Sequence, residues 1–178
     1  MRSLFLFLLI AALAACSAPP ARLEVPLRAV SPAAFGQSLT LTQQITVEMR
    51  GEARSIEAVL AISPERIDLA GLAMGQRLID VHFDGASLTE KRSPLLPEAV
   101  TGARILRDVM LAYWPREALI AALPTGWRIE DSAGRRRVFC ADEPVITIEY
   151  SGEPRWRGRA HLIQHRLGYS LTIDSDEA

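Results

Sequence analysis

The chain has 178 residues, of which 20 are basic and 21 acidic, so its formal net charge is −1. A chain this close to neutral lacks the strongly basic surface on which general nucleic-acid binding depends. Hydrophobic residues make up 49% of the sequence, and the length suits one domain with a substantial core.

The N-terminus predicts export and a lipid anchor. Arg2 precedes an apolar run, residues 4–15, which is shorter than the ~20 residues that a membrane-spanning helix needs. The run therefore predicts a signal peptide over residues 1–15. Its end, Leu13-Ala14-Ala15-Cys16, resembles the bacterial lipobox, which implies an N-acyl group and an S-diacylglycerol on Cys16 after cleavage. The alternative is an ordinary signal peptide beside which Cys16 is incidental.

The residue after the cysteine bears on localisation. It is Ser17 and not an aspartate. By resemblance to the enterobacterial sorting rule, this implies anchoring in the outer membrane, with the protein on the periplasmic face. Several acyl chains would anchor it stably, because each buried methylene contributes ~0.8 kcal/mol. Cys140 would be the only other cysteine of the mature chain, so we expect no intramolecular disulfide.

Residues 16–35 are rich in Ala, Pro and Arg and have no periodicity, so they predict a tether to a single domain over residues 36–178. Apolar and polar residues then alternate, which is typical of half-buried strands. Short turns, including one over residues 71–75, separate these strands and predict an antiparallel meander. The expected strands are residues 39–49, 56–62, a third from residue 67, 79–83 and 87–91.

One stretch has helical periodicity. Apolar residues recur at spacings of one, three and four over residues 101–113, and Pro115 fits the first turn of a second helix that reaches Leu123. Strand patterns then resume over residues 127–129, 135–140, 145–150, 159–167 and 169–173. We therefore predict an α+β fold in which about ten antiparallel strands form a strongly curved sheet. The two helices should cover its concave face.

Four segments carry a family resemblance. They are Gly75-Gln76-Arg77-Leu78, Phe83-Asp84-Gly85, Leu111-Ala112-Tyr113-Trp114-Pro115 and Leu123-Pro124-Thr125-Gly126-Trp127. Their order resembles a bacterial lipoprotein family catalogued as domain of unknown function 3261, and the likeness covers roughly residues 39–173. Members often accompany aryl-polyene pigment genes, which implies an envelope lipid or pigment context.

The layout is also similar to the lipoprotein-localisation proteins LolA and LolB. That resemblance implies an unclosed antiparallel barrel whose apolar concave face, covered by helices, accepts acyl chains. It further implies a LolA-like periplasmic carrier as a candidate partner. In that group an apolar turn between early strands protrudes, and the matching turn here is Leu72-Ala73-Met74.

The strand and helix patterns nominate the walls of a cavity. Apolar residues of one parity on two strands would face the apolar stripe of the first helix. The candidate ligand-binding residues are Ile45, Val47, Met49, Ile79, Val81 and Phe83 on the strands and Leu106, Val109 and Met110 on the helix. The alternative is that all of them are ordinary core.

Two further groups are candidate contacts with a membrane or a partner protein. Leu72 and Met74 belong to the apolar turn. Arg155, Trp156 and Arg157, with the run Arg135-Arg136-Arg137, would form a basic edge for anionic headgroups. The alternative for this edge is a solvated rim whose arginines pair with Glu130, Asp131 and Glu153.

Motifs for catalysis and metal binding are missing from the sequence. It has no GxSxG, HExxH, phosphate loop or dinucleotide fingerprint, so we expect no enzymatic activity and no cofactor. His161 and His165 would be about 13 Å apart on a strand, too far for one metal ion. We expect His82 to be solvated and Cys140 to be a small buried residue.

The leading hypothesis is a monomeric lipoprotein that binds or relays an acylated or polyene lipid. A structural or scaffolding lipoprotein is the alternative, and an enzyme acting on lipid or pigment precursors comes third.

Overall fold

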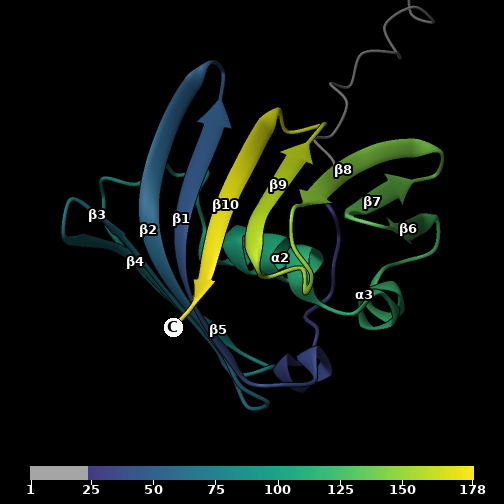
Figure 1. Cartoon of the computed structure of the whole chain (residues 1–178), viewed down its shortest axis with the longest axis horizontal. Coiled ribbons are helices and arrows are strands. Elements are labelled where there is room, and N and C mark those ends of the chain that lie inside the picture. Colours follow the sequence, from purple (N-terminus) through teal and green to yellow (C-terminus); the bar gives the residue numbers. More distant parts are fainter. Residues whose placement is uncertain (1–23) are drawn as a thin grey trace, which may run out of the picture.

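The computed structural model describes residues 24–178. The predicted signal peptide, Cys16 and the first part of the predicted tether lie outside the described residues. Within them a single sheet of antiparallel strands curves around helix α2 (Figure 1). The helices are η1 (Pro32–Phe35), α2 (Gly102–Tyr113) and α3 (Arg116–Ala122). The strands are β1 (Leu39–Met49), β2 (Glu52–Ile62), β3 (Ile67–Ala73), β4 (Gln76–Phe83), β5 (Leu88–Arg92), β6 (Trp127–Ser132), β7 (Arg135–Cys140), β8 (Glu143–Tyr150), β9 (Gly158–Gln164) and β10 (Tyr169–Glu177).

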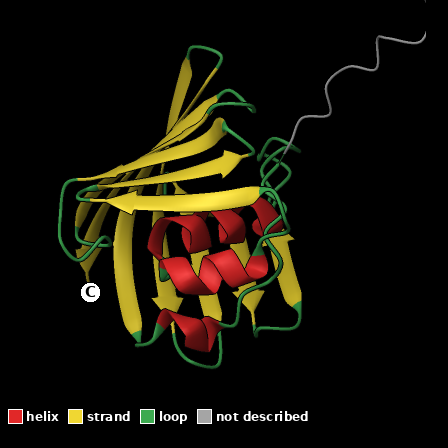
Figure 2. Ribbon diagram, turned by 90° about the vertical axis from the view of Figure 1, so that its right-hand side faces the viewer, coloured by secondary structure: helices red, strands yellow, loops and turns green. Residues whose placement is uncertain are grey.

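The strand order confirms the predicted antiparallel meander and adds how its two halves join. The order is β5-β4-β3-β2-β1-β10-β9-β8-β7-β6, so the first and last strands pair at the centre of the sheet. The sheet is unclosed, with β5 and β6 at its edges. Figure 2 shows the helices gathered on the inner side of the curve. The predicted curved α+β fold is therefore confirmed, although α3 lies against β6 at one edge while α2 occupies the concavity.

Two side-chain acceptors hold the first turn of helix α2. The hydroxyl of Thr101 accepts a hydrogen bond from the Arg104 N–H, and the Glu90 carboxylate of β5 accepts one from the Gly102 N–H. Such side-chain acceptors satisfy N–H groups that have no partner within a helix. A Cβ on Gly102 would lie 2.6 Å from that carboxylate oxygen, so a larger residue here would displace the Glu90 side chain from this hydrogen bond.

Pro115 ends α2 and leaves carbonyl groups without helical partners. The Leu111 carbonyl would bond to the N–H of residue 115, which proline lacks. It instead accepts a hydrogen bond from Arg136 of β7 at 2.8 Å, and the Trp114 carbonyl accepts another at 2.9 Å. The Tyr150 hydroxyl of β8 donates to the Ala112 carbonyl at 2.7 Å, and burial raises the pKa of Tyr150 to about 12. Side chains from the sheet thus cap the end of α2.

The predicted tether is wrong from Glu24 onward. Residues 24–35, here called the strap, run alongside α2 and α3 to η1 (Figure 1). Val25, Val30 and Phe35 are buried in the core cluster. The strap's backbone is held by tertiary contacts, since the Arg28 N–H donates to the Ala122 carbonyl of α3 at 3.2 Å. Residues 24–31 therefore stay packed although they form no helix or strand.

Two expected boundaries also differ. The predicted turn over residues 71–75 is wrong, because β3 continues to Ala73 and only Met74 and Gly75 form the turn. Gly71 is a strand residue whose Cβ would lie 2.9 Å from Ile79, so this glycine permits close packing of β3 on β4. Strand β9 ends at Gln164, before the predicted end at residue 167, because the Gln164 side chain accepts bonds from the next turn.

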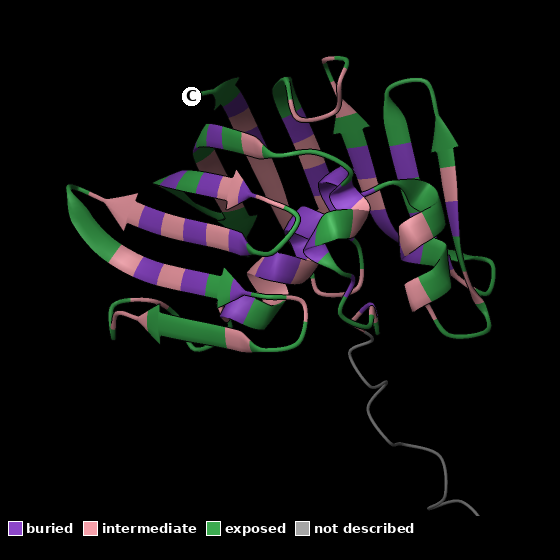
Figure 3. Cartoon of the chain, turned by 90° about the horizontal axis from the view of Figure 1, so that it is seen from below, coloured by how far each residue is buried: buried purple, intermediate pink, exposed green. Residues whose placement is uncertain are grey.

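Burial alternates along the strands as the parity predicts (Figure 3). On β1 this alternation weakens towards the hairpin with β2. Leu41 and Gln43 are buried, Ile45 and Val47 are half-buried, and Met49 is 37% exposed. The outer ends of the central strands extend past α2 in both side views (Figures 1 and 2). Apolar residues there lie on the concave face beyond the helix.

Candidate functional site

An apolar cavity of about 130 Å³ lies between α2 and the concave face of the central strands. Its walls come mainly from aliphatic residues of β1, β2, β10 and α2, with a few polar groups at one side. The lining residues are Gln43, Ile45, Val47, Met49, Ile56, Ala58, Leu69, Ile79, Ala99, Val100, Arg104, Ile105, Asp108, Val109, Tyr169, Leu171 and Ile173. Half-buried apolar side chains form its outer part, and the exposed Met49 lies at its rim.

The structure divides the nine predicted cavity residues into two groups. Ile45, Val47, Met49, Ile79 and Val109 line the cavity. The other four do not, and the prediction is wrong in placing them there: Val81, Phe83, Leu106 and Met110 are buried in the packed core. Strand parity and helix periodicity select a face, and the four residues share the correct face but lie where helix and sheet are in full contact.

A buried charged cluster borders the cavity, and sequence reasoning missed it. Asp108 of α2 is 5% exposed, and its Oδ2 accepts a hydrogen bond from the Tyr169 hydroxyl of β10 at 2.7 Å. Its Oδ1 lies 3.9 Å from Nε of Arg107. Arg104 and Arg107 both bind the carboxylate of Glu24 at the start of the strap. One face of α2 therefore presents charged groups beside an otherwise aliphatic cavity.

Burial governs the pKa of Asp108. Removing the carboxyl from water disfavours its charged form and raises the pKa to about 6, although the Tyr169 hydroxyl and the nearby arginines oppose the shift. The sequence held a signal for this residue. Asp108 lies three residues after Ile105 and four before Ala112, so a carboxyl occupies the apolar stripe of an amphipathic helix.

Replacing Asp108 with asparagine should stabilise the protein above pH 6 and not near pH 4. The folded state binds the Asp108 proton more tightly than the unfolded state, because its pKa is raised from the ordinary 3.8 to about 6. The free-energy cost of ionising the buried Asp108 carboxyl is therefore absent when the pH is below the ordinary pKa of 3.8. It is fully present when the pH is above the raised pKa of about 6. We expect the variant to gain up to about 3 kcal/mol at pH 8 and nothing near pH 4, by urea unfolding.

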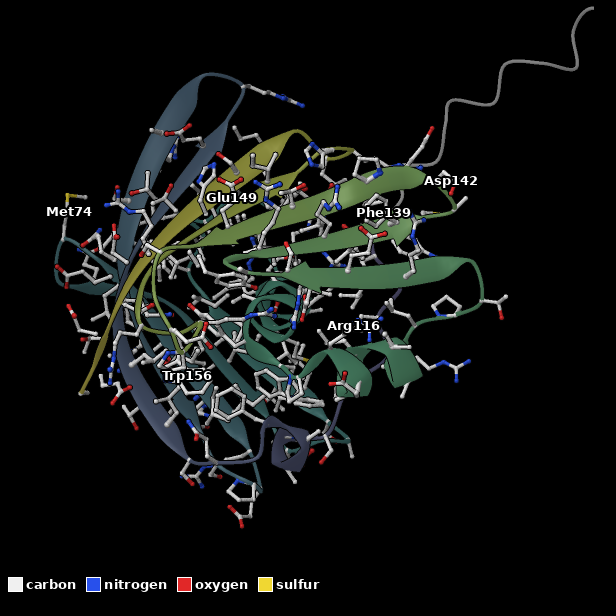
Figure 4. All side chains as sticks on the ribbon, turned by 45° about the vertical axis from the view of Figure 1, so that its right-hand side comes forward. Met74, Arg116, Phe139, Asp142, Glu149 and Trp156 are labelled. Atoms are coloured by element: carbon white, nitrogen blue, oxygen red, sulfur yellow. The ribbon has the colours of Figure 1, made fainter. Side chains whose placement is uncertain are left out.

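A matched control uses the exposed Asp142, which lies at the turn between β7 and β8 (Figure 4). Asp142→Asn should change the unfolding free energy by less than about 0.5 kcal/mol at either pH. A gain at Asp108→Asn that is equal at pH 4 and pH 8 would show that ionisation of this group has no part in stability.

A second polar group at the cavity, the side-chain amide nitrogen of Gln43, makes two hydrogen bonds. Gln43 of β1 donates to the Tyr113 hydroxyl at 3.0 Å and to the Ser175 hydroxyl at 2.9 Å. Burial raises the pKa of Tyr113, so this network is neutral over the physiological range. It fixes the end of α2 against β1 and β10 and leaves that part of the cavity uncharged.

The predicted basic edge is paired internally. Arg155 lies 2.9 Å from the Asp131 carboxylate, and Arg157 lies 3.4 Å from Glu177. The Trp156 ring packs on Phe35 of η1 at 5.3 Å between ring centroids, and its indole N–H donates to Glu177. These contacts favour the solvated-rim interpretation of the three residues.

The predicted apolar turn is split by the longer β3. Leu72 is a half-buried strand residue paired with Glu57 and Arg77, so its assignment to a protruding turn is wrong. Met74 is fully exposed, and Figure 4 shows it at the tip of the β3–β4 hairpin, far from Trp156. Its φ of +49° is uncommon for a residue other than glycine, asparagine or aspartate.

The histidines bind separate polar partners. His161 contacts Thr172 at 3.1 Å, His165 contacts Thr147 at 2.9 Å, and His82 contacts Asp68 at the surface. Within residues 24–178, no group of three or more His, Cys, Asp or Glu side chains is placed to hold a metal ion. Cys140 is half-buried.

No helix in the described part of the chain is long and apolar enough to cross a membrane.

Comparison with known proteins identifies the family but no characterised relative. No curated protein matches the sequence. The family model described as "Protein of unknown function (DUF3261)" matches residues 40–177. This range spans the sheet, α2, α3 and the cavity between them, while the whole strap precedes it. The chain therefore belongs to the DUF3261 family.

Proposed function

We propose that this protein is an outer-membrane-anchored periplasmic lipoprotein that binds or relays an acylated or polyene lipid. The observation that carries the proposal is the aliphatic cavity between α2 and the concave sheet. A cavity lined by such side chains stays dry and takes up apolar ligands. Charged groups at one side of it would orient a ligand that has a polar head.

The size of the cavity indicates how such a ligand would lie. About 130 Å³ is close to a cavity that accepts benzene and below the ~300 Å³ at which pockets for whole small molecules begin. The cavity would therefore hold the end of one chain. That end would pack against the half-buried Val47 and Leu171, and the rest would leave past the exposed Met49 at the rim of the cavity.

The predicted anchor would place the cavity near the membrane. Cys16 precedes Glu24 by eight residues, which span at most about 28 Å when fully extended. Glu24 binds Arg104, which lines the cavity. An acylated Cys16 would thus keep the cavity within reach of the outer membrane, where a LolA-like carrier could deliver or receive the ligand.

The test is native mass spectrometry of the mature chain exported behind an ordinary signal peptide, so that it is released without acyl groups. We expect either a bound hydrophobic mass or uptake of tetradecanoate. Ala58→Phe, which puts a ring into the cavity, should weaken uptake at least about tenfold, because overfilling a packed site is unfavourable. Val59→Phe, on the adjacent exposed position, is the control and should leave uptake unchanged.

Two outcomes of this experiment would contradict the proposal or its site. A clean mass that also refuses the added acyl chain would end the lipid-binding proposal. Equal uptake by the Ala58 and Val59 variants would place the ligand elsewhere.

A second candidate function is that of a scaffolding lipoprotein that acts through surface contacts. It is favoured by Met74, a fully exposed apolar side chain held at positive φ. Asparagine would suit that backbone better, so stability does not explain methionine there. On this proposal Met74→Glu abolishes co-purification of an envelope partner but leaves lipid content unchanged. Met74→Asn controls for the turn itself.

A further inference from the structure

Two arginines on one face of α2 share a single carboxylate next to the cavity. Arg104 lines the cavity, and Arg107 lies one turn later with its side chain 13% exposed. Residues three apart on a helix are neighbours on its surface. Arg104 Nη2 binds one oxygen of Glu24, and Arg107 Nη1 binds the other at 2.8 Å. Glu24 thus bridges the two guanidinium groups as an external anion would.

The bridge leaves the cluster incompletely bonded. Within the described residues, Arg104 Nε, Arg107 Nη2 and Asp108 Oδ1 are buried without a hydrogen-bond partner. Each guanidinium has five donors, of which Glu24 takes only a part. Leaving buried donors unpaired costs free energy, and an anion placed differently from the Glu24 carboxylate could satisfy them better. These unpaired atoms indicate that the cluster is not built for Glu24 alone.

Glu24 is also the member most easily moved. Its side chain is 42% exposed, whereas the side chain of Asp108 is 7% exposed and bonded to Tyr169. Burial opposes its charge, but hydrogen bonds and the charges of Arg104 and Arg107 outweigh this and lower the pKa of Glu24, so it is an anion at neutral pH. The strap is held next to it by the buried Val25. The Glu24 side chain can therefore rotate away while the strap stays in place.

We propose that Arg104 and Arg107 form the head-group site for an amphiphile with one negative charge, and that Glu24 occupies this site when no ligand is bound. The apolar chain of the ligand enters the adjoining cavity, so this inference rests on the proposed lipid-binding function. Exchange of one monoanion for another keeps the charge balance with Asp108, which avoids an uncompensated buried charge. A carboxylate or a phosphodiester meets this requirement and matches the bidentate geometry of arginine.

The experiment measures binding to the mature chain by calorimetry below the micelle concentration. The probes are tetradecanoate, tetradecanoyl lysophosphatidylglycerol and the neutral tetradecanol. Glu24→Gln should bind both anions at least about tenfold more tightly, because the competing charge-assisted bonds are gone. Tetradecanol binding should stay unchanged. Glu117→Gln, an exposed carboxylate on α3, changes the net charge equally and should have no effect.

Arg104→Gln should remove the preference for the anions over tetradecanol, and Arg104→Lys should retain part of it. Both variants are first checked for the wild-type unfolding transition, and Glu24→Gln decides the question if either fails to fold. If Glu24→Gln binds only one of the two anions more tightly, the head-group site is supported and that anion identifies the head group. If Glu24→Gln binds the anions like wild type, or gains equally for tetradecanol, the head-group site is disproved while lipid binding stands. If no probe binds any variant, the lipid-binding function itself is disproved.

Discussion

Replacing Arg136 with methionine is expected to lower the free energy of unfolding by about 4 kcal/mol. The side chain is 1% exposed and holds together three parts of the molecule. It donates to the Leu111 and Trp114 carbonyls at the end of α2 and binds Asp131 through two bonds of 2.8 and 2.9 Å. Methionine fills a similar space but donates nothing, so the carbonyl that Pro115 deprives of a partner stays unsatisfied in the interior.

The neighbouring Arg137→Met is the matched control, measured by the same urea titration followed by circular dichroism. Arg137 is 45% exposed and pairs with Glu130 at the surface, so its loss should cost less than about 1 kcal/mol. Similar losses for the two variants would mean that capping of α2 by Arg136 contributes little. Asp131 keeps Arg155 as an ion-pair partner in both variants. The loss in the Arg136 variant therefore comes mainly from the two unsatisfied carbonyls and not from an unpaired carboxylate.

The sheet could be predicted because its signal is local. Alternation along one strand depends only on which face is buried, and β1 follows it from Leu39 to Gln44 before it weakens near the hairpin. Turn chemistry was less informative at Gly71, where glycine serves close packing between strands and does not make a turn. The sequence pattern alone cannot tell a glycine that bends the chain from one that lets a neighbour approach.

The strap escaped prediction because its order comes from distant residues. Val25, Val30 and Phe35 are spaced irregularly, so no periodic pattern marks them as buried. Their burial depends on the outer side of α2 and α3, and the position of that surface depends on the complete sheet. A Pro- and Ala-rich stretch of this kind is compositionally similar to a flexible linker.

The candidate site was predicted in part for a related reason. Parity placed Ile45 and Val47 on the concave face, but it does not say where α2 stops covering that face, and this boundary separates cavity from core. The same parity rule could also have predicted that Arg136 is buried. It shares parity with the buried Val138, so within the run of three arginines it was the one to expect inside. The usable signal was a charged residue at a position expected to be apolar, on a strand face for Arg136 and on a helix stripe for Asp108.

Trp114→Ala is expected to cost about 4 kcal/mol and to release the strap. The indole is 0% exposed, donates to the Ser31 carbonyl at 3.3 Å and packs against Phe35 at 5.0 Å between ring centroids. It therefore joins the end of α2 to the segment that carries Glu24. Under conditions where the variant remains folded by circular dichroism, trypsin should cut after the exposed Arg28 much faster than in wild type.

Trp114→Phe keeps most of the packing and loses the N–H, so we expect a cost of about 1 kcal/mol and little change in cleavage. If Trp114→Ala is destabilised but cut at the wild-type rate, the strap is held independently of α2. Faster cleavage would instead mean that the end of α2, the strap and the Glu24 bridge open together. The predicted anchor would then be coupled to the cavity, because the same short segment leads from Cys16 to the two arginines beside it.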